Sequence, residues 1–276
     1  MSDETLEIQI AQGVAIVWLA REKVRNAFNE RSIAEITQAF TALGRDDEVR
    51  VVVLAARGPA FCAGADLEWM RKMAGYSHDE NLLDAGRLAA MLAAIANCPK
   101  PVVARVHGDA VAGGVGLVAA CDIALASHDA AFCLSEVKLG LIPATIAPYV
   151  MRAIGARQAQ RYFLSAEKFD STEACRIGLI HEAVPAGQLD ARLNELLAAL
   201  LQTSREASAQ AKRLVLDLAD RPIDADLIAD TVERIARVRA SGDGREGITA
   251  FLEKRKPRWV REFEEMQAAA DDDEEM

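Results

Sequence analysis

The sequence contains few of the residues and patterns that build disulfide frameworks, metal sites and membrane segments. Its five cysteines stand singly, with no Cys-x-x-Cys pair and no histidine at ligand spacing. The most apolar stretch, residues 110–126, is interrupted by three glycines and Asp122, and the first ten residues lack the basic and apolar regions of a signal peptide. We therefore expect reduced thiols, no metal, no membrane span and a cytoplasmic protein.

Positive charge is also scarce. The chain has 42 acidic and 32 basic residues and a formal net charge of -10, which disfavours nucleic acid and anionic membranes as partners. Basic residues nevertheless cluster at 21–25 and at 254–258, and such clusters suit a small anionic ligand. At 276 residues the chain is long enough for one large core with a smaller appended region.

Apolar patterns predict alternating strands and helices in the first two thirds of the chain. The predicted strands are residues 6–10, 14–19, 51–54, 102–106, 123–126 and 181–184. The predicted helices are residues 30–43, 79–97, 146–165 and 171–177, the last with a capping pattern from Asp170 and Glu173. This order indicates the α/β fold class.

Residues 188–263 read as almost wholly helical, with breaks near Ser204, Pro222 and 242–244, where Asp243 is expected to cap the next helix. We expect residues 1–200 to form the α/β core and 201–263 a helical region through which subunits dock. The acidic run at the end predicts a disordered tail over 264–276.

Two segments of small residues each follow a buried strand and open a helix. They are residues 59–67 and 107–117. Free N–H groups at a helix N-terminus favour negative charge, so two such segments after neighbouring strands could converge on one oxygen as an oxyanion hole. On its spacing alone, the first segment is better explained as a tight strand-to-helix connection that needs small residues. A dinucleotide-binding loop is disfavoured, because the glycines at 113, 114 and 116 lack the G-x-G-x-x-G spacing.

A third segment, residues 135–143, places Glu136 among apolar and small residues. Partial burial raises the pKa of a carboxyl group toward values that suit proton transfer. The alternative is a surface pair between Glu136 and Lys138.

Together, in this order, the three segments resemble the crotonase (enoyl-CoA hydratase/isomerase) superfamily, and the resemblance extends from about Leu6 to Trp259. It implies a spiral of ββα turns with C-terminal helices that assemble homotrimers, often paired into homohexamers. It also implies an acyl-CoA substrate, with coenzyme A as part of that substrate and no separate cofactor. The implied oxyanion donors are the N–H groups of Ala65 and Gly113, and the implied proton-transfer group is Glu136.

The resemblance also implies residues that contact the substrate or its coenzyme A part. The basic loop matches the family's adenine and phosphate loop, with Glu22 in place of the usual proline, and the segment 251–256 matches the family's C-terminal F-x-E-K-R motif. The implied contacts are Lys23, Arg25, Ala27, Ala63, Asp66, Leu67, Gly114, Pro143, Phe251 and Lys254, the last two often reaching across a subunit boundary.

One position departs from the family pattern. Typical hydratases of the family carry a first glutamate where this chain has Gly116, and Glu136 occupies the position of the second. Three reactions stay open: hydration with Glu136 alone, hydration with a carboxylate from another segment, and double-bond isomerisation. A catalytically silent acyl-CoA-binding protein is a fourth possibility, which the retained Glu136 disfavours.

The stretch 132–150 resembles one bacterial subgroup more narrowly. Its members are assigned as methylglutaconyl-CoA hydratases of leucine breakdown and their isoprenoid-chain relatives. Such a substrate has a free distal carboxylate, for which Lys138 and Arg152 are candidate partners by their place in the sequence.

Overall fold

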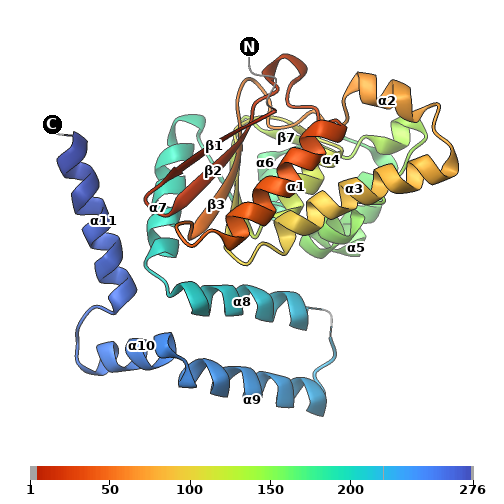
Figure 1. Cartoon of the computed structure of the whole chain (residues 1–276). Helices are drawn as coiled ribbons and strands as arrows, with labels where there is room; N and C mark the ends of the chain where they lie inside the picture. Colours follow the sequence, from red (N-terminus) through yellow and green to blue (C-terminus); the bar gives the residue numbers. More distant parts are fainter. Residues whose placement is uncertain (1–4, 220, 275–276) are drawn as a thin grey trace. The chain divides into compact units, whose positions relative to one another are not determined.

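The computed structural model describes residues 5–219 and 221–274, which belong to two compact units (Figure 1). The N-terminal unit comprises Met1–Cys98 and Val102–Glu195, and the C-terminal unit comprises Pro99–Pro101 and Leu196–Met276. The boundary that we expected at residue 200 falls within α7 (Leu189–Leu201).

A six-stranded sheet forms the centre of the N-terminal unit, in the order β1-β2-β3-β4-β6-β9. Its strands are β1 (Leu6–Ala11), β2 (Val14–Leu19), β3 (Val51–Ala56), β4 (Val102–Val106), β6 (Ile123–Ser127) and β9 (Glu182–Val184). Within the described residues of this sheet, only β1 and β2 pair in antiparallel fashion, and the other pairs are parallel. All six residues of β3 are buried, which explains its continuous apolar sequence.

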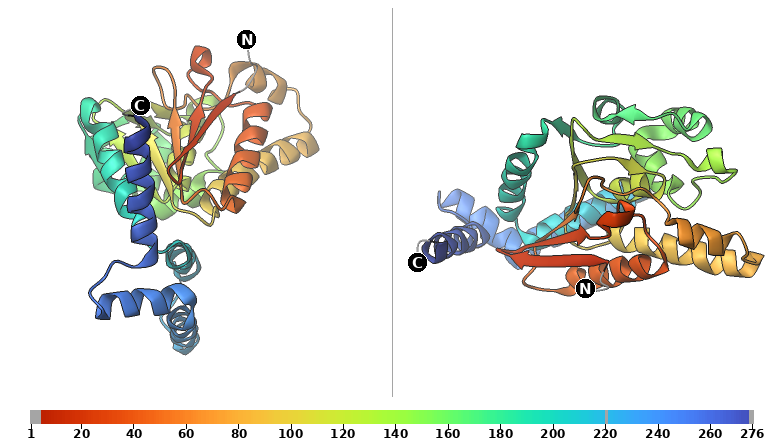
Figure 2. Two further views of the ribbon diagram at one scale, coloured as in Figure 1. Left: turned by 60° about the vertical axis from the view of Figure 1, so that its left-hand side comes forward. Right: turned by 90° about the horizontal axis from the view of Figure 1, so that it is seen from above.

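Four helices pack in succession within this unit: α1 (Glu30–Arg45), α3 (His78–Ala96), α4 (Gly113–Ala120) and α5 (Ala147–Ser165). Figures 1 and 2 show α1 and α3 side by side. The stripe Ile33, Ile36, Phe40 and Leu43 faces the core from α1 and is fully buried, as its helical spacing predicts.

A small three-stranded sheet carries the segments that matter for function. It contains β5 (Ala110–Val111), β7 (Ala131–Cys133) and β8 (Phe169–Asp170), with β7 in the centre. Two short helices, α2 (Leu67–Met73) and α6 (Ser171–Ile177), begin at aspartates whose side chains accept from main-chain N–H groups of the first turn.

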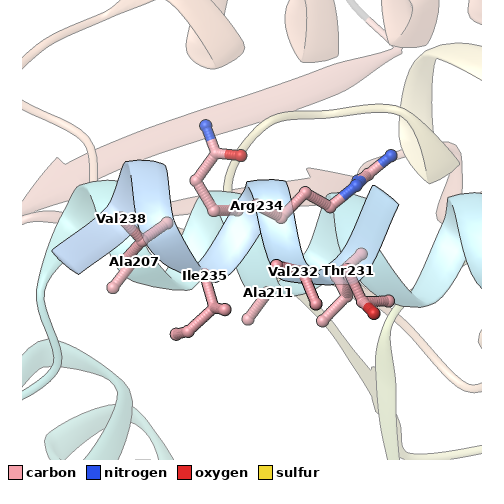
Figure 3. A pocket seen from close by; sticks show the side chains of 9 residues that line it. Ala207, Ala211, Thr231, Val232, Arg234, Ile235 and Val238 are labelled. Carbon is pink, nitrogen blue, oxygen red and sulfur yellow. The ribbon is translucent and has the colours of Figure 1, made fainter. Parts of the chain in front are cut away.

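The C-terminal unit is helical, with α8 (Arg205–Leu218), α9 (Ala225–Ala240), α10 (Gly242–Leu252) and α11 (Arg258–Glu274). An ion pair of 2.9 Å between Asp217 and Arg234 joins α8 to α9. Between these helices lies an apolar groove of about 480 Å³ (Figure 3). Its lining residues are Ala207, Gln210, Ala211, Leu214, Thr231, Val232, Arg234, Ile235 and Val238.

The α/β fold class and the predicted strands and helices are confirmed, with ends that shift by one or two residues. The prediction that Asp243 caps a helix is wrong. Ser241 is the N-cap of α10 and accepts from the Gly244 N–H, while Asp243 lies in the first turn and accepts from the Ser204 hydroxyl at 2.7 Å. Of the tail 264–276, residues up to Glu274 belong to α11, and residues 275 and 276 lie outside the described residues.

Among the helices of the described residues, none combines the length and the apolar character that a membrane span requires. Over the same ranges, no group of three or more His, Cys, Asp or Glu side chains is arranged to hold a metal ion.

Candidate active site

The two segments of small residues, 59–67 and 107–117, lie against each other in the structure. The Cys62 N–H donates to Asp109 O at 3.1 Å, and the Val111 N–H donates to Cys62 O at 2.9 Å. The segments that follow β3 and β4 are therefore held together by main-chain hydrogen bonds.

Ala65 has a main-chain N–H without a protein acceptor among the described residues. Ala65 forms an isolated parallel bridge with Phe28, in which the Phe28 N–H donates to Gly64 O at 2.8 Å and the Asp66 N–H donates to Phe28 O at 3.0 Å. In a parallel bridge of this kind the N–H of the central residue points away from its partner. The Ala65 N–H is thus free to meet a ligand.

Gly113 is the first residue of α4, where a helical N–H has no acceptor within the helix. The residue before it, Ala112, has φ 50° and ψ -119°, and its N–H donates to Cys133 O at 2.7 Å. A Cβ at Gly114 would lie 2.6 Å from Cys62 O, so only glycine permits this approach of the two segments.

Cys62 belongs to the first of these segments but is not a nucleophile. Its side chain is fully buried, and burial raises the pKa of its thiol to about 12. All five cysteines are free thiols, as expected.

Glu136 is brought to this place by the pairing of β5 with β7. Val111 pairs with Cys133, and Glu136 begins a 3-10 helix, η2 (Glu136–Leu139), three residues later. Its side chain is half-buried, and Oε2 is buried without a hydrogen-bond partner in the part of the chain that the structure describes. Burial raises the pKa of this carboxyl group above its ordinary value of 4.5. A desolvated carboxylate with a free oxygen is suited to accept and return a proton.

Gly116 lies on α4 where that helix meets the start of α5. A Cβ at this position would lie 2.2 Å from Ile146 Cγ2 and 2.8 Å from Ile146 Cβ. Ile146 is itself buried. The place that a side chain at residue 116 would occupy is therefore filled by an aliphatic group, and no carboxylate fits there without repacking.

Arg21 has a role that the sequence did not reveal. Although it stands at the start of the basic loop, its guanidinium turns inward and pairs with Asp66 Oδ2 at 2.9 Å. The other Asp66 oxygen caps α2 by accepting from the Glu68 N–H at 2.8 Å. Arg21 and Asp66 thus fix the residue next to Ala65. The N-cap position of Asp66 before a helix was readable from the sequence, whereas the ion pair joins residues 45 apart.

The other predicted contact residues differ in exposure. Lys23, Arg25 and Leu67 are exposed near the two donor segments, while Ala27 and Pro143 are buried and Ala63 is half-buried. Phe251 and Lys254 belong to the C-terminal unit and are exposed there. Their contacts with coenzyme A stay predictions.

Main-chain N–H groups without protein acceptors and a partly buried carboxylate, carried by segments that pair through β5 and β7, are groups that an enzyme acting on a carbonyl compound uses. The chain belongs to the enoyl-CoA hydratase/isomerase family, whose model matches residues 9–262. The crotonase superfamily and an acyl-CoA enzyme, both expected from the three segments, are confirmed.

Individual relatives are similar to this chain over nearly its whole length. A solved enoyl-CoA hydratase of Shewanella pealeana is 44% identical, with a TM-score of 0.90 over 93% of this chain and 96% of its own. A solved Legionella pneumophila protein assigned to the crotonases is 42% identical, with a TM-score of 0.88 over 94% of this chain and 100% of its own. A Thermus thermophilus protein assigned as an enoyl-CoA hydratase is 33% identical over 91% of this chain and 100% of its own.

Proposed function

We propose that the protein is a hydratase that adds water across the α,β double bond of an enoyl-CoA thioester. The observation that carries the proposal is the partly buried Glu136 carboxylate. It follows β7, which pairs with β5 of the donor segment 107–117. Membership of the enoyl-CoA hydratase/isomerase family supports the substrate class.

In this mechanism the thioester oxygen accepts from the N–H groups of Ala65 and Gly113. Water bonds to C3 and loses a proton to Glu136, the double-bond electrons move toward the carbonyl, and the resulting enolate takes that proton from Glu136 at C2. The product is a 3-hydroxyacyl-CoA. Removing one donor of an oxyanion hole typically costs on the order of 3 kcal/mol of transition-state stabilisation. No separate cofactor takes part in these steps.

The coenzyme A part would lie along the basic loop, where Lys23 and Arg25 are exposed cations beside the donor segment. Ala63 and Leu67 would border it, since the Ala63 N–H donates to Arg25 O at 2.9 Å and so joins the loop to the segment. Phe251 and Lys254 of a neighbouring subunit would complete the site.

A matched pair of variants tests the role of Glu136. We expect wild type to consume crotonyl-CoA with loss of the absorbance of the conjugated thioester and a mass gain of one water. Glu136→Gln should lower kcat by roughly a hundredfold or more, because the base is lost, while Glu48→Gln, an exposed site outside the active centre, should not. Equal rates in both variants would remove Glu136 from the mechanism.

Double-bond isomerisation is the second candidate, and the packing at Gly116 favours it. Since Ile146 fills the space beside Gly116, this position supplies no second carboxylate, and a single proton shuttle suffices for isomerisation. A product of unchanged mass from a β,γ-enoyl-CoA, with no hydrated product, would establish this reaction instead.

We propose 3-methylglutaconyl-CoA, an intermediate of leucine breakdown, or a related branched thioester as the substrate. Resemblance of 132–150 to that subgroup supports the proposal, and Lys138 and Arg152 are both exposed cations. A higher kcat/KM for 3-methylglutaconyl-CoA than for crotonyl-CoA is expected. The reverse order would remove this assignment while leaving hydration in place.

We also propose that the protein works as a homotrimer or homohexamer assembled through its C-terminal unit. Apolar side chains on α9 support this, because Val232 is 60% and Ile235 is 47% exposed in the single chain. Both line the groove of Figure 3.

A further inference from the structure

We infer that Phe28 is the positioning residue that sets both donors of the proposed oxyanion hole, an inference that rests on the proposed function. Phe28 lies between the basic loop and the N-cap of α1, Asn29, and is 3% exposed. It touches the two donor segments by different means, one through its main chain and the other through its ring.

The main chain of Phe28 orients Ala65. Its N–H and its carbonyl are both used by the residues on either side of Ala65, with bonds of 2.8 Å to Gly64 O and 3.0 Å from the Asp66 N–H. These two bonds fix the peptide plane from which the Ala65 N–H projects. A side-chain substitution at residue 28 leaves them available.

The ring of Phe28 supports Gly113. A Cβ built on Gly113 would lie 2.2 Å from Phe28 Cζ, 3.0 Å from Cε1 and 3.3 Å from Cε2, so the ring edge is in contact with the main chain of Gly113. Gly113 does not have a positive φ, and the ring is what excludes a larger residue. The ring therefore limits where the Gly113 N–H can lie.

The position of the Phe28 ring is restricted by Trp69. It packs against Trp69 of α2 with ring centroids 6.0 Å apart and a tilt of 55°. The Trp69 indole N–H donates to Asp84 Oδ1 of α3 at 3.2 Å. Support of this kind makes the position of Gly113 depend on a rigid aromatic contact.

The first experiment compares Phe28→Leu with Phe40→Leu, a buried phenylalanine of α1 that serves as the control for loss of packing. In Phe28→Leu we expect kcat for crotonyl-CoA to fall roughly tenfold to a hundredfold, with KM changed by less than about threefold, since a displaced donor affects mainly the transition state. Phe40→Leu should lower the melting temperature without this loss of kcat. Phe28→Met gives the same comparison if Phe28→Leu folds poorly.

A spectroscopic readout separates positioning from stability. Bound butyryl-CoA labelled with ¹³C at the thioester carbonyl should show an infrared band shifted to lower frequency in wild type, because two donors polarise the carbonyl. In Phe28→Leu the band should move back toward that of free butyryl-CoA. In Phe40→Leu it should stay at the wild-type position.

A double variant tests the contact between ring and glycine directly. Gly113→Ala should lose activity because the new Cβ overlaps Phe28 Cζ, and Phe28→Leu should rescue it, since leucine lacks that atom. We expect Phe28→Leu/Gly113→Ala to match Phe28→Leu in kcat.

The inference would be overturned if Phe28→Leu kept kcat within about twofold and kept the wild-type band position. The position of the Gly113 N–H would then be determined by other groups. A wild type that turns over enoyl-CoA and shifts the butyryl-CoA band, together with such a variant, would leave the proposed function intact. A wild type that does neither would overturn both.

Discussion

At the scale of single residues, the carboxyl group of Glu136 combines partial burial with an oxygen that has no hydrogen-bond donor among the described residues. Burial raises its pKa in the folded chain above the ordinary value of 4.5. Below the ordinary pKa the group is neutral in both folded and unfolded chains. As the pH rises through the folded pKa, the folded protein must ionise a desolvated group and loses stability relative to the unfolded chain.

Glu136→Gln should therefore be more stable than wild type at neutral pH. The difference in melting temperature should shrink as the pH falls to about 4, where the carboxyl group of unfolded wild type becomes protonated. Differential scanning fluorimetry over this pH range measures it.

Glu173 provides a control of opposite sign. Hydrogen bonds from Arg176 and Tyr162 lower the pKa of Glu173 to about 2, so its ionised form stabilises the folded protein at neutral pH. Glu173→Gln should be less stable than wild type near pH 7, and this deficit should be lost as the pH falls through the folded pKa. A stability difference for Glu136→Gln that does not vary with pH would contradict the assigned burial effect.

At the scale of elements, the sequence predicts most strands and helices because buried positions give apolar residues at the spacing of a strand or a helix. β4 is predicted to the residue, and α6 is predicted with its cap at Asp170, since local side-chain chemistry decides both. The α10 cap was misassigned to Asp243 because Ser241 and Asp243 both suit a helix start, and the choice depends on the contact of Asp243 with Ser204.

The candidate site was predictable only in part. The segments 59–67, 107–117 and 135–143 are recognisable in the sequence. The first two are rich in small residues, which exposed main-chain donors require, and the third has a single glutamate among apolar and small residues. The pairing of Arg21 with Asp66, the ring of Phe28 under Gly113, and the contact of Ile146 with Gly116 are tertiary contacts without a local signal.

The contact between α4 and α5 predicts a coupled pair of substitutions. Gly116→Ala should lower the free energy of unfolding by roughly 1–3 kcal/mol, because its Cβ overlaps Ile146. Ile146→Ala alone should cost about 2–5 kcal/mol through the cavity that it leaves. The double variant should be more stable than the sum predicts by about 1 kcal/mol or more, as measured by urea unfolding.

Gly86 is the matched control for this cycle. It lies in α3, and apart from its chain neighbours and the backbone of its own helix, a Cβ at this position would meet no atom of the described residues within 4 Å. Gly86→Ala should therefore be neutral or should stabilise the protein by up to about 1 kcal/mol. A Gly116→Ala variant as stable as Gly86→Ala would show that α5 yields easily and that a side chain at 116 is compatible with the fold.

At the scale of the whole molecule, a charge placed in the groove between α8 and α9 tests the proposed assembly. Ile235→Asp places a carboxylate among the apolar side chains of the groove and should shift the protein to smaller species in sedimentation velocity. Ala236→Asp adds the same charge to an exposed residue of α9 that does not line the groove, and should leave the mass unchanged. Equal masses for both variants and wild type would exclude the groove from the subunit interface.

The proposed donors at Ala65 and Gly113 are main-chain groups, so no alanine substitution deletes either N–H, although one at Phe28 should displace that of Gly113. Among encoded substitutions, only proline removes an N–H. A semisynthetic chain with an ester in place of the Ala65 amide would delete one donor and keep every side chain. Substitutions of side chains around the substrate should therefore alter substrate preference in descendants of this sequence, while the proposed main-chain donors are inherited unchanged.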